Sequence, residues 1–114
     1  IPQIGVIHDL NFEHYPKDLP KNVLKYYQKY MPLFSQKAEK IITVSNFSKT
    51  DIVKNYGILP KKITVIYNGV NDAFRALNTN QKKVFIEQNN NNRPFFIYVG
   101  SLHKRKNIQR MFET

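Results

Sequence analysis

The chain has 114 residues and contains no cysteine, no tryptophan and only four glycines. The absence of cysteine excludes disulfide bonds and thiolate metal sites, and it is compatible with the cytoplasmic location that we expect. No apolar run approaches the roughly 20 residues of a membrane-spanning helix, and no signal peptide is recognisable. Because the chain begins within a predicted strand and without methionine, we expect it to be a piece of a longer protein.

Acidic residues are also scarce. Eight Asp and Glu stand against 18 Lys and Arg, which gives a formal net charge of +10. This excess implies an anionic partner, namely a nucleotide phosphate, a nucleic acid or an acidic membrane surface, and charge alone does not choose among them. The three histidines lack carboxylates or thiolates at ligand spacing, so no metal site is predicted. We expect two of them, His14 and His103, to be surface residues.

Three apolar, β-branched segments are predicted to be strands: Ile1–Ile7, Lys40–Val44 and Lys62–Tyr67. Helical patterns separate them, so the order is strand, helix, strand, helix, strand. This alternation is typical of a parallel sheet in an α/β protein. The fold class that we predict is therefore a Rossmann-like α/β fold.

The helical patterns lie between these strands. From Lys21 onwards, apolar residues recur at steps of three and four, as in an amphipathic helix, and Pro32 suggests a kink or a break there. Ser48 and Asp51 have the spacing of a capping box and are interpreted as the start of the second helix. The segment of residues 11–19, which contains a proline and leads to another at position 20, is predicted to be a loop.

The second part of the chain breaks this alternation. Residues 72–93 are interpreted as a connection between domains, with a short helix over 82–87 and a polar, asparagine-rich tract over 88–92. Residues 94–100 are predicted to form a buried strand, and only residues 107–114 remain as a helix to cover it. We therefore expect this strand to be the first of a second domain.

A basic turn follows the predicted last strand. The strand ends at Gly100, and the next residues include Lys104, Arg105 and Lys106 ahead of the predicted helix. Backbone N–H groups, the positive end of a helix dipole and basic side chains together favour a phosphate. The alternative interpretation is a solvated basic turn that happens to precede a helix.

Three segments, in this order and spacing, resemble the retaining glycosyltransferases with two Rossmann-like domains (the GT-B fold), specifically group 1 or family 4, which includes mannosyltransferases. These segments are Ile4–Leu10, ending in His-Asp-Leu; Ile41–Val70, containing Val-Ser-Asn-Phe-Ser and Tyr-Asn-Gly-Val; and Ile97–Asn107. The resemblance assigns residues 1–71 to the end of the N-terminal domain, 72–93 to the linker, and 94–114 to the start of the C-terminal, nucleotide-sugar-binding domain.

The resemblance implies transfer of a sugar from a nucleotide diphosphate donor to an acceptor hydroxyl with retention of configuration, without a bound metal or other cofactor. The implied partners are this donor and a glycan or lipid-linked acceptor, as in polysaccharide or glycolipid synthesis. The matching site residues are His8 as the catalytic residue and Gly100, Ser101, Arg105 and Lys106 for the donor diphosphate. Asp9 matches an acceptor-contacting or loop-capping position. Since most of the C-terminal domain lies outside these residues, we expect the chain alone to be inactive.

Two other interpretations stay open. One is a basic α/β module that binds nucleic acid or an anionic membrane; the other is an inert scaffold. The sequence contains no recognisable nucleic-acid module, and its basic residues are dispersed, so nucleic acid is the less favoured partner. A predicted exposed helix face would suit either solvent or peripheral contact with anionic lipid. Its residues are Lys21, Lys25, Tyr26, Lys29, Tyr30 and Lys37.

Overall fold

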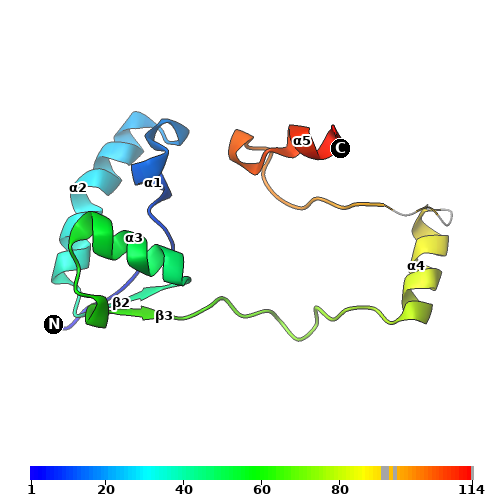
Figure 1. Ribbon diagram of the computed structural model, residues 1–114, viewed down its shortest axis with the longest axis horizontal. Helices are drawn as coiled ribbons and strands as arrows, with labels where there is room; N and C mark the ends of the chain where they lie inside the picture. The colour runs from blue at the N-terminus through cyan, green and yellow to red at the C-terminus, as the bar shows by residue number, and fades with distance from the viewer. Residues whose placement is uncertain (91–92, 94, 114) are drawn as a thin grey trace. The chain divides into compact units, whose positions relative to one another are not determined.

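The computed structural model describes residues 1–90, 93 and 95–113. It divides into two compact units, Ile1–Asn71 and Asp72–Thr114 (Figure 1). The boundary follows Asn71, which is also the last residue that the sequence analysis assigns to the N-terminal domain. The assignment of the segments to domains of a longer enzyme stays a prediction.

The first unit contains a three-stranded parallel sheet in the order β1 (Ile4–Val6), β2 (Lys40–Thr43) and β3 (Ile63–Val65). Gly5 pairs with Ile41, and Ile41 pairs with Ile63. This sheet confirms the predicted α/β class with a Rossmann-like parallel sheet. β1 and β3 are shorter than predicted at both ends, whereas β2 begins at Lys40 as predicted and ends one residue early.

Two long helices pack with this sheet, α2 (Lys21–Lys37) and α3 (Asn46–Tyr56), as Figure 1 shows. Ile41, Ile52 and Ile63 are almost fully buried at their junction. Gly5 of β1 lies beside Ala38 at the end of α2, where an added Cβ atom would make an ordinary van der Waals contact of 3.7 Å with the Cβ of Ala38. The core of the first unit therefore lies between one face of the sheet and these helices.

The loop predicted over residues 11–19 is wrong in detail. It folds into a short helix, α1 (Asn11–His14), and a 3₁₀ turn, η1 (Pro16–Asp18). Phe12 is buried, and its ring stacks on Tyr27 of α2 at 5.2 Å between centroids. Apolar packing thus orders a segment whose proline content had suggested a loop.

Of the two alternatives predicted at Pro32, a kink or a break, the break is wrong, because α2 continues without interruption to Lys37. Proline removes only one backbone N–H group, and tertiary packing compensates for that loss. Met31, the residue before Pro32, contributes to this packing because its side chain contacts the core. The Ser35 hydroxyl donates to the Met31 carbonyl oxygen at 2.7 Å, which gives this turn an additional hydrogen bond.

The second unit contains α4 (Thr79–Asn90), a 3₁₀ turn, η3 (Lys104–Lys106), and α5 (Ile108–Phe112). The predicted short helix over 82–87 is therefore too short at both ends. Asn78 and Gln81 form a reciprocal capping box: Gln81 N donates to Asn78 Oδ1 at 2.9 Å, and Asn78 N donates to Gln81 Oε1 at 3.0 Å. Residues 91 and 92 of the polar tract lie outside the described residues.

The predicted strand over 94–100 is wrong for the residues that the structure describes. Residues 95–100 are irregular, and the side chains of Phe96 and Val99 are exposed. A strand requires a neighbouring strand for its backbone hydrogen bonds, and none is present in the described part of this unit. Pro94 lies outside that part. None of the helices described is long and apolar enough to cross a membrane.

Candidate functional site

The carboxyl end of β1 presents the first two predicted site residues. His8 and Asp9 are exposed and follow the buried Ile7, whose N–H group donates to the Ile42 carbonyl oxygen at 2.9 Å. Ligands of open α/β sheets bind at this edge. One carboxylate oxygen of Asp9, Oδ1, accepts a hydrogen bond from Asn11 N at 2.9 Å and fixes the start of α1.

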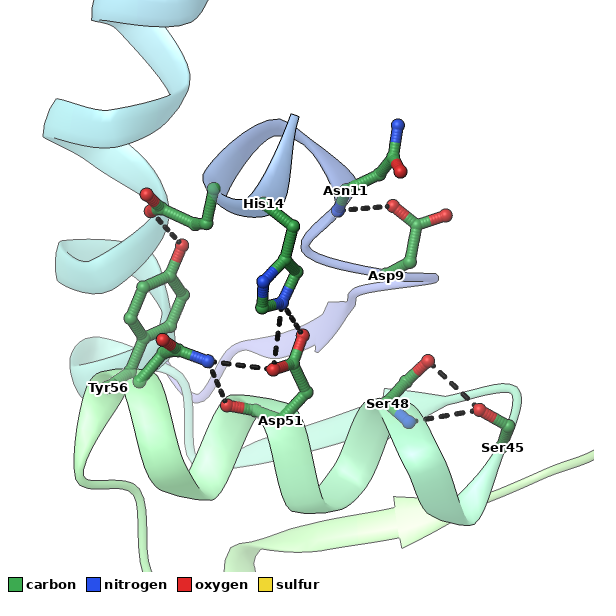
Figure 2. A network of polar contacts seen from close by, with 9 residues as sticks. Asp9, Asn11, His14, Ser45, Ser48, Asp51 and Tyr56 are labelled. Carbon is green, nitrogen blue, oxygen red and sulfur yellow. Dashed lines mark hydrogen bonds and ion pairs between the residues drawn. The ribbon is translucent and has the colours of Figure 1, made fainter. Parts of the chain in front are cut away.

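An ion pair that the sequence analysis missed joins α1 to α3 (Figure 2). His14 Nε2 lies 2.8 Å from Asp51 Oδ2 and 3.0 Å from Asp51 Oδ1. The Asn55 amide donates to Asp51 Oδ1 at 2.8 Å and to the Asp51 carbonyl oxygen at 2.9 Å. The His14 side chain is 43% exposed, so it is a surface residue as predicted, but Asp51 is buried and holds its ring.

The predicted capping box of Ser48 and Asp51 is wrong. The helix begins three residues earlier, and Ser45 caps it: its hydroxyl accepts from Ser48 N at 3.0 Å and donates to Ser48 Oγ at 2.9 Å (Figure 2). Asp51 therefore lies in the second turn of α3, where its carboxylate meets His14. Ser45, two residues after the end of β2, was the sequence signal for the earlier start.

A second contact between α1 and α3 joins Tyr56 to Glu13. The Tyr56 hydroxyl donates to Glu13 Oε1 at 2.9 Å. Burial, followed by this hydrogen bond and the negative charges of Glu13 and Asp51, raises the pKa of Tyr56 above its usual range. Side chains of α3 therefore hold α1 at two positions: Asp51 contacts His14, and Tyr56 contacts Glu13.

This contact predicts a stability change in alkaline solution. Above about pH 10 the unfolded chain releases the Tyr56 proton while the folded chain keeps it, so the folded state loses stability as the pH rises toward the folded pKa. Urea unfolding between about pH 8 and pH 11 should show a smaller loss in Tyr56→Phe than in the unmodified chain. The exposed Tyr15, changed to phenylalanine, is the control. The prediction would be contradicted if the unmodified chain and Tyr56→Phe lost the same free energy of unfolding over this pH range.

A pocket of about 400 Å³ lies beside the ion pair, at the same edge of the sheet. It is lined by Asp9, Leu10, Asn11, His14, Tyr15, Phe47 and Asp51. The pocket thus includes Asp9 of the predicted site and both members of the ion pair, while His8 lies outside its lining.

The four predicted diphosphate residues lie in the second unit, in one short segment. The Tyr98 hydroxyl donates to the Ser101 carbonyl oxygen at 3.0 Å and lies over Gly100. The side chains of Arg105 and Lys106 are exposed in η3. Their proximity along the chain leaves them free to contact one anion from the same turn.

The hydrogen bonds of this turn refine the phosphate prediction. Arg105 N donates to His103 Nδ1 at 3.2 Å, Lys106 N donates to the His103 carbonyl oxygen at 2.8 Å, and Asn107 N donates to the Lys104 carbonyl oxygen at 3.0 Å. Asn107 has a left-handed backbone, so α5 begins after the cations rather than at them. These three N–H groups already have partners, and any anion is bound here mainly by the basic side chains. His103, predicted to be a surface residue, is partly buried.

Across the described ranges, no group of three His, Cys, Asp or Glu side chains is arranged to hold a metal ion. The basic turn offers the positive charge in the second unit, and the pocket beside α1 offers carboxylates and aromatic rings in the first. The two places are therefore suited to different chemistry: an anion at the turn and a neutral, hydroxyl-bearing molecule at the pocket.

Comparison with known proteins identifies a family and a similar protein. Residues 1–74 match the family described as Glycosyltransferase Family 4. The chain is similar to the O-antigen chain mannosyltransferase RfbU of Salmonella typhimurium, with 29% identity over 112 residues. This alignment covers 98% of the chain but only 28% of the relative. No solved structure matches the chain significantly.

Proposed function

The chain belongs to Glycosyltransferase Family 4, and we propose that it is the central part of an enzyme that transfers a sugar from a nucleotide diphosphate donor to an acceptor hydroxyl with retention of configuration. The observation that carries this proposal is the family match over residues 1–74, which includes His8 and Asp9 at the carboxyl end of β1. The similarity to a mannosyltransferase of O-antigen chains supports a hexose donor and a role in polysaccharide synthesis.

In this proposal the exposed cations of η3 bind the leaving diphosphate. As the glycosidic bond breaks, negative charge grows on the phosphate oxygens, and Arg105 and Lys106 stabilise that charge with charge-assisted hydrogen bonds. Such contacts are strongest in the transition state and therefore raise the rate. At Gly100 and Ser101 the backbone can approach the diphosphate closely, because glycine has no side chain. These contacts require no metal ion or other cofactor.

His8 contacts the donor sugar in the same proposal. It is exposed at the edge of the sheet and has no hydrogen-bond partner among the residues described, so its ring nitrogens are available to a sugar hydroxyl. The 114-residue chain alone is expected to be inactive, because the family's nucleotide-binding domain extends beyond the residues that we assign to it.

Competition binding to the full-length protein tests this proposal against a nucleic-acid-binding module. Nucleoside diphosphates should bind with one-to-one stoichiometry and displace a fluorescent nucleotide sugar. Oligonucleotides should compete weakly and without dependence on their length. Strong, length-dependent and salt-sensitive binding of oligonucleotides, unaffected by nucleoside diphosphates, would favour the nucleic-acid module instead.

We infer that α2 contacts an anionic membrane surface at the cytoplasmic side, where a lipid-linked acceptor would be presented. The helix has no acidic residue, and its lysines Lys21, Lys25, Lys29 and Lys37 are all exposed. The ring of Tyr30 lies 4.8 Å from that of Tyr26 and 5.9 Å from that of Phe34, between centroids. Lysines beside a row of aromatic rings suit the interface of an anionic bilayer.

Vesicle co-sedimentation tests this contact. Each lysine near an anionic surface contributes about 1 kcal/mol, so reversing Lys25 and Lys29 to glutamate should weaken binding to phosphatidylglycerol vesicles of the full-length protein by more than about tenfold. Lys54→Glu, an exposed site on α3, is the control and should have a smaller effect. Equal binding to phosphatidylcholine vesicles, or equal loss in the control, would contradict the inference.

A further inference from the structure

The pocket beside α1 combines an unpartnered aromatic ring with free polar groups. Phe47, the second residue of α3, is 76% exposed and has no ring partner in the described part of the chain. Its position in the pocket lining gives the pocket an apolar, aromatic surface on which a ligand can pack. Polar residues surround it, and they limit the kind of ligand.

The polar groups of the pocket have hydrogen-bonding capacity left. Asp9 uses one carboxylate oxygen for Asn11 N, and its Oδ2 has no partner among the described residues. His14 uses Nε2 for Asp51, which leaves Nδ1 available. The ion pair and the bond from Asn55 fix the His14 ring, so that this nitrogen is held in place before a ligand binds (Figure 2).

Charge decides which ligand fits. Two carboxylates, Asp9 and Asp51, line the pocket. Asp51 is paired with His14, whereas Asp9 has no basic partner among the described residues and would repel a phosphate or a nucleotide. No three-ligand metal group exists in the described chain. A neutral pyranose ring satisfies both features, since its hydroxyls donate to carboxylates and its C–H face packs on an aromatic ring. The volume of about 400 Å³ lies within the range of small-molecule sites.

We propose that this pocket is a subsite for one sugar ring of the acceptor glycan. Phe47 packs against the apolar face of the ring, Asp9 accepts from a hydroxyl, and His14, positioned by Asp51, hydrogen-bonds a second hydroxyl. The assignment of the bound sugar to the acceptor rests on the proposed glycosyl transfer. The pocket is formed within Ile1–Asn71 alone, so saccharide binding can be measured separately from catalysis.

Titration of the isotope-labelled 114-residue chain with a neutral mannose-terminated trisaccharide, followed by NMR, tests the subsite. Amide shifts are expected at residues 9–11 and 46–48. Phe47→Ala should weaken binding about tenfold, whereas Leu59→Ala, which truncates another exposed apolar side chain of the first unit, should not. Asp9→Asn keeps an oxygen that accepts the hydrogen bond from Asn11 N, and it should weaken binding less than Phe47→Ala does. Binding by Phe47→Ala equal to that of the unmodified chain, or shifts confined to other residues, would overturn the subsite.

Kinetics of the full-length protein separate this subsite from the proposed function. Phe47→Ala should raise the acceptor KM about tenfold, whereas Leu59→Ala, which lies outside the pocket lining, should leave the acceptor KM unchanged. Sugar transfer with an unchanged acceptor KM overturns the subsite and leaves the function intact. Saccharide binding at the pocket without transfer from any donor overturns the function, and with it the acceptor role.

Discussion

Replacement of Lys106 by alanine in the full-length protein is expected to lower kcat for sugar transfer by about 100-fold to 1,000-fold, the loss typical for one group that stabilises charge in a transition state. The side chain is exposed in η3, beside Arg105, and neither forms part of the core. The fold should therefore survive the change, which a circular-dichroism melting curve can verify. The donor KM should change less than kcat, because the phosphate charge that we propose Lys106 contacts grows mainly as the glycosidic bond breaks.

Lys104 provides the matched control in the same turn. It carries the same charge and is equally exposed, but it is not among the residues assigned to the diphosphate. Lys104→Ala should lower kcat by less than about tenfold. Similar losses in the two variants would mean that the turn attracts the donor by general charge, and they would contradict a specific role for Lys106.

Replacement of Ile52 by alanine is expected to lower the free energy of unfolding by about 2–5 kcal/mol, the usual cost of truncating a large buried aliphatic side chain. Ile52 is fully buried on α3, in the same cluster as Ile41 and Ile63 of the sheet. The loss is a large fraction of the stability of an ordinary domain. Because the sheet edge that carries His8 and Asp9 rests on this cluster, activity should be lost at the unfolding temperature.

Urea unfolding measures this effect, and Leu59→Ala is the control because the Leu59 side chain is 60% exposed. The control should change the free energy of unfolding by less than about 0.5 kcal/mol. A loss below about 1 kcal/mol in Ile52→Ala would show that the first unit is not held together by the core described above.

Local sequence patterns predicted the features that depend on neighbouring residues. The apolar β-branched segments identified the three parallel strands, and the apolar stripe identified α2, because each pattern reports which face of an element is buried. The carboxyl-edge position of His8 and Asp9 followed from the end of the first strand. The parallel sheet and the two long helices of the first unit were therefore accessible from the sequence.

Contacts between distant residues were not accessible in this way. His14 and Asp51 are 37 positions apart, and nothing near either residue indicates its partner. The segment over 94–100 shows the converse: its composition favours a strand, but a strand forms only where another strand supplies hydrogen-bond partners. The pocket beside α1 depends on the ion pair and on α1, which the sequence analysis interpreted as a loop, so its lining could not be predicted.

Sugar transfer by the full-length protein, measured with a panel of nucleotide diphosphate sugars and a glycan acceptor, tests the central claim most directly. The account predicts transfer from one donor and loss of that activity in His8→Ala, while the melting curve stays unchanged. No transfer from any donor, together with salt-sensitive binding to nucleic acid or anionic lipid, would contradict it. The basic residues would then serve a binding surface, and the family membership would record a shared fold.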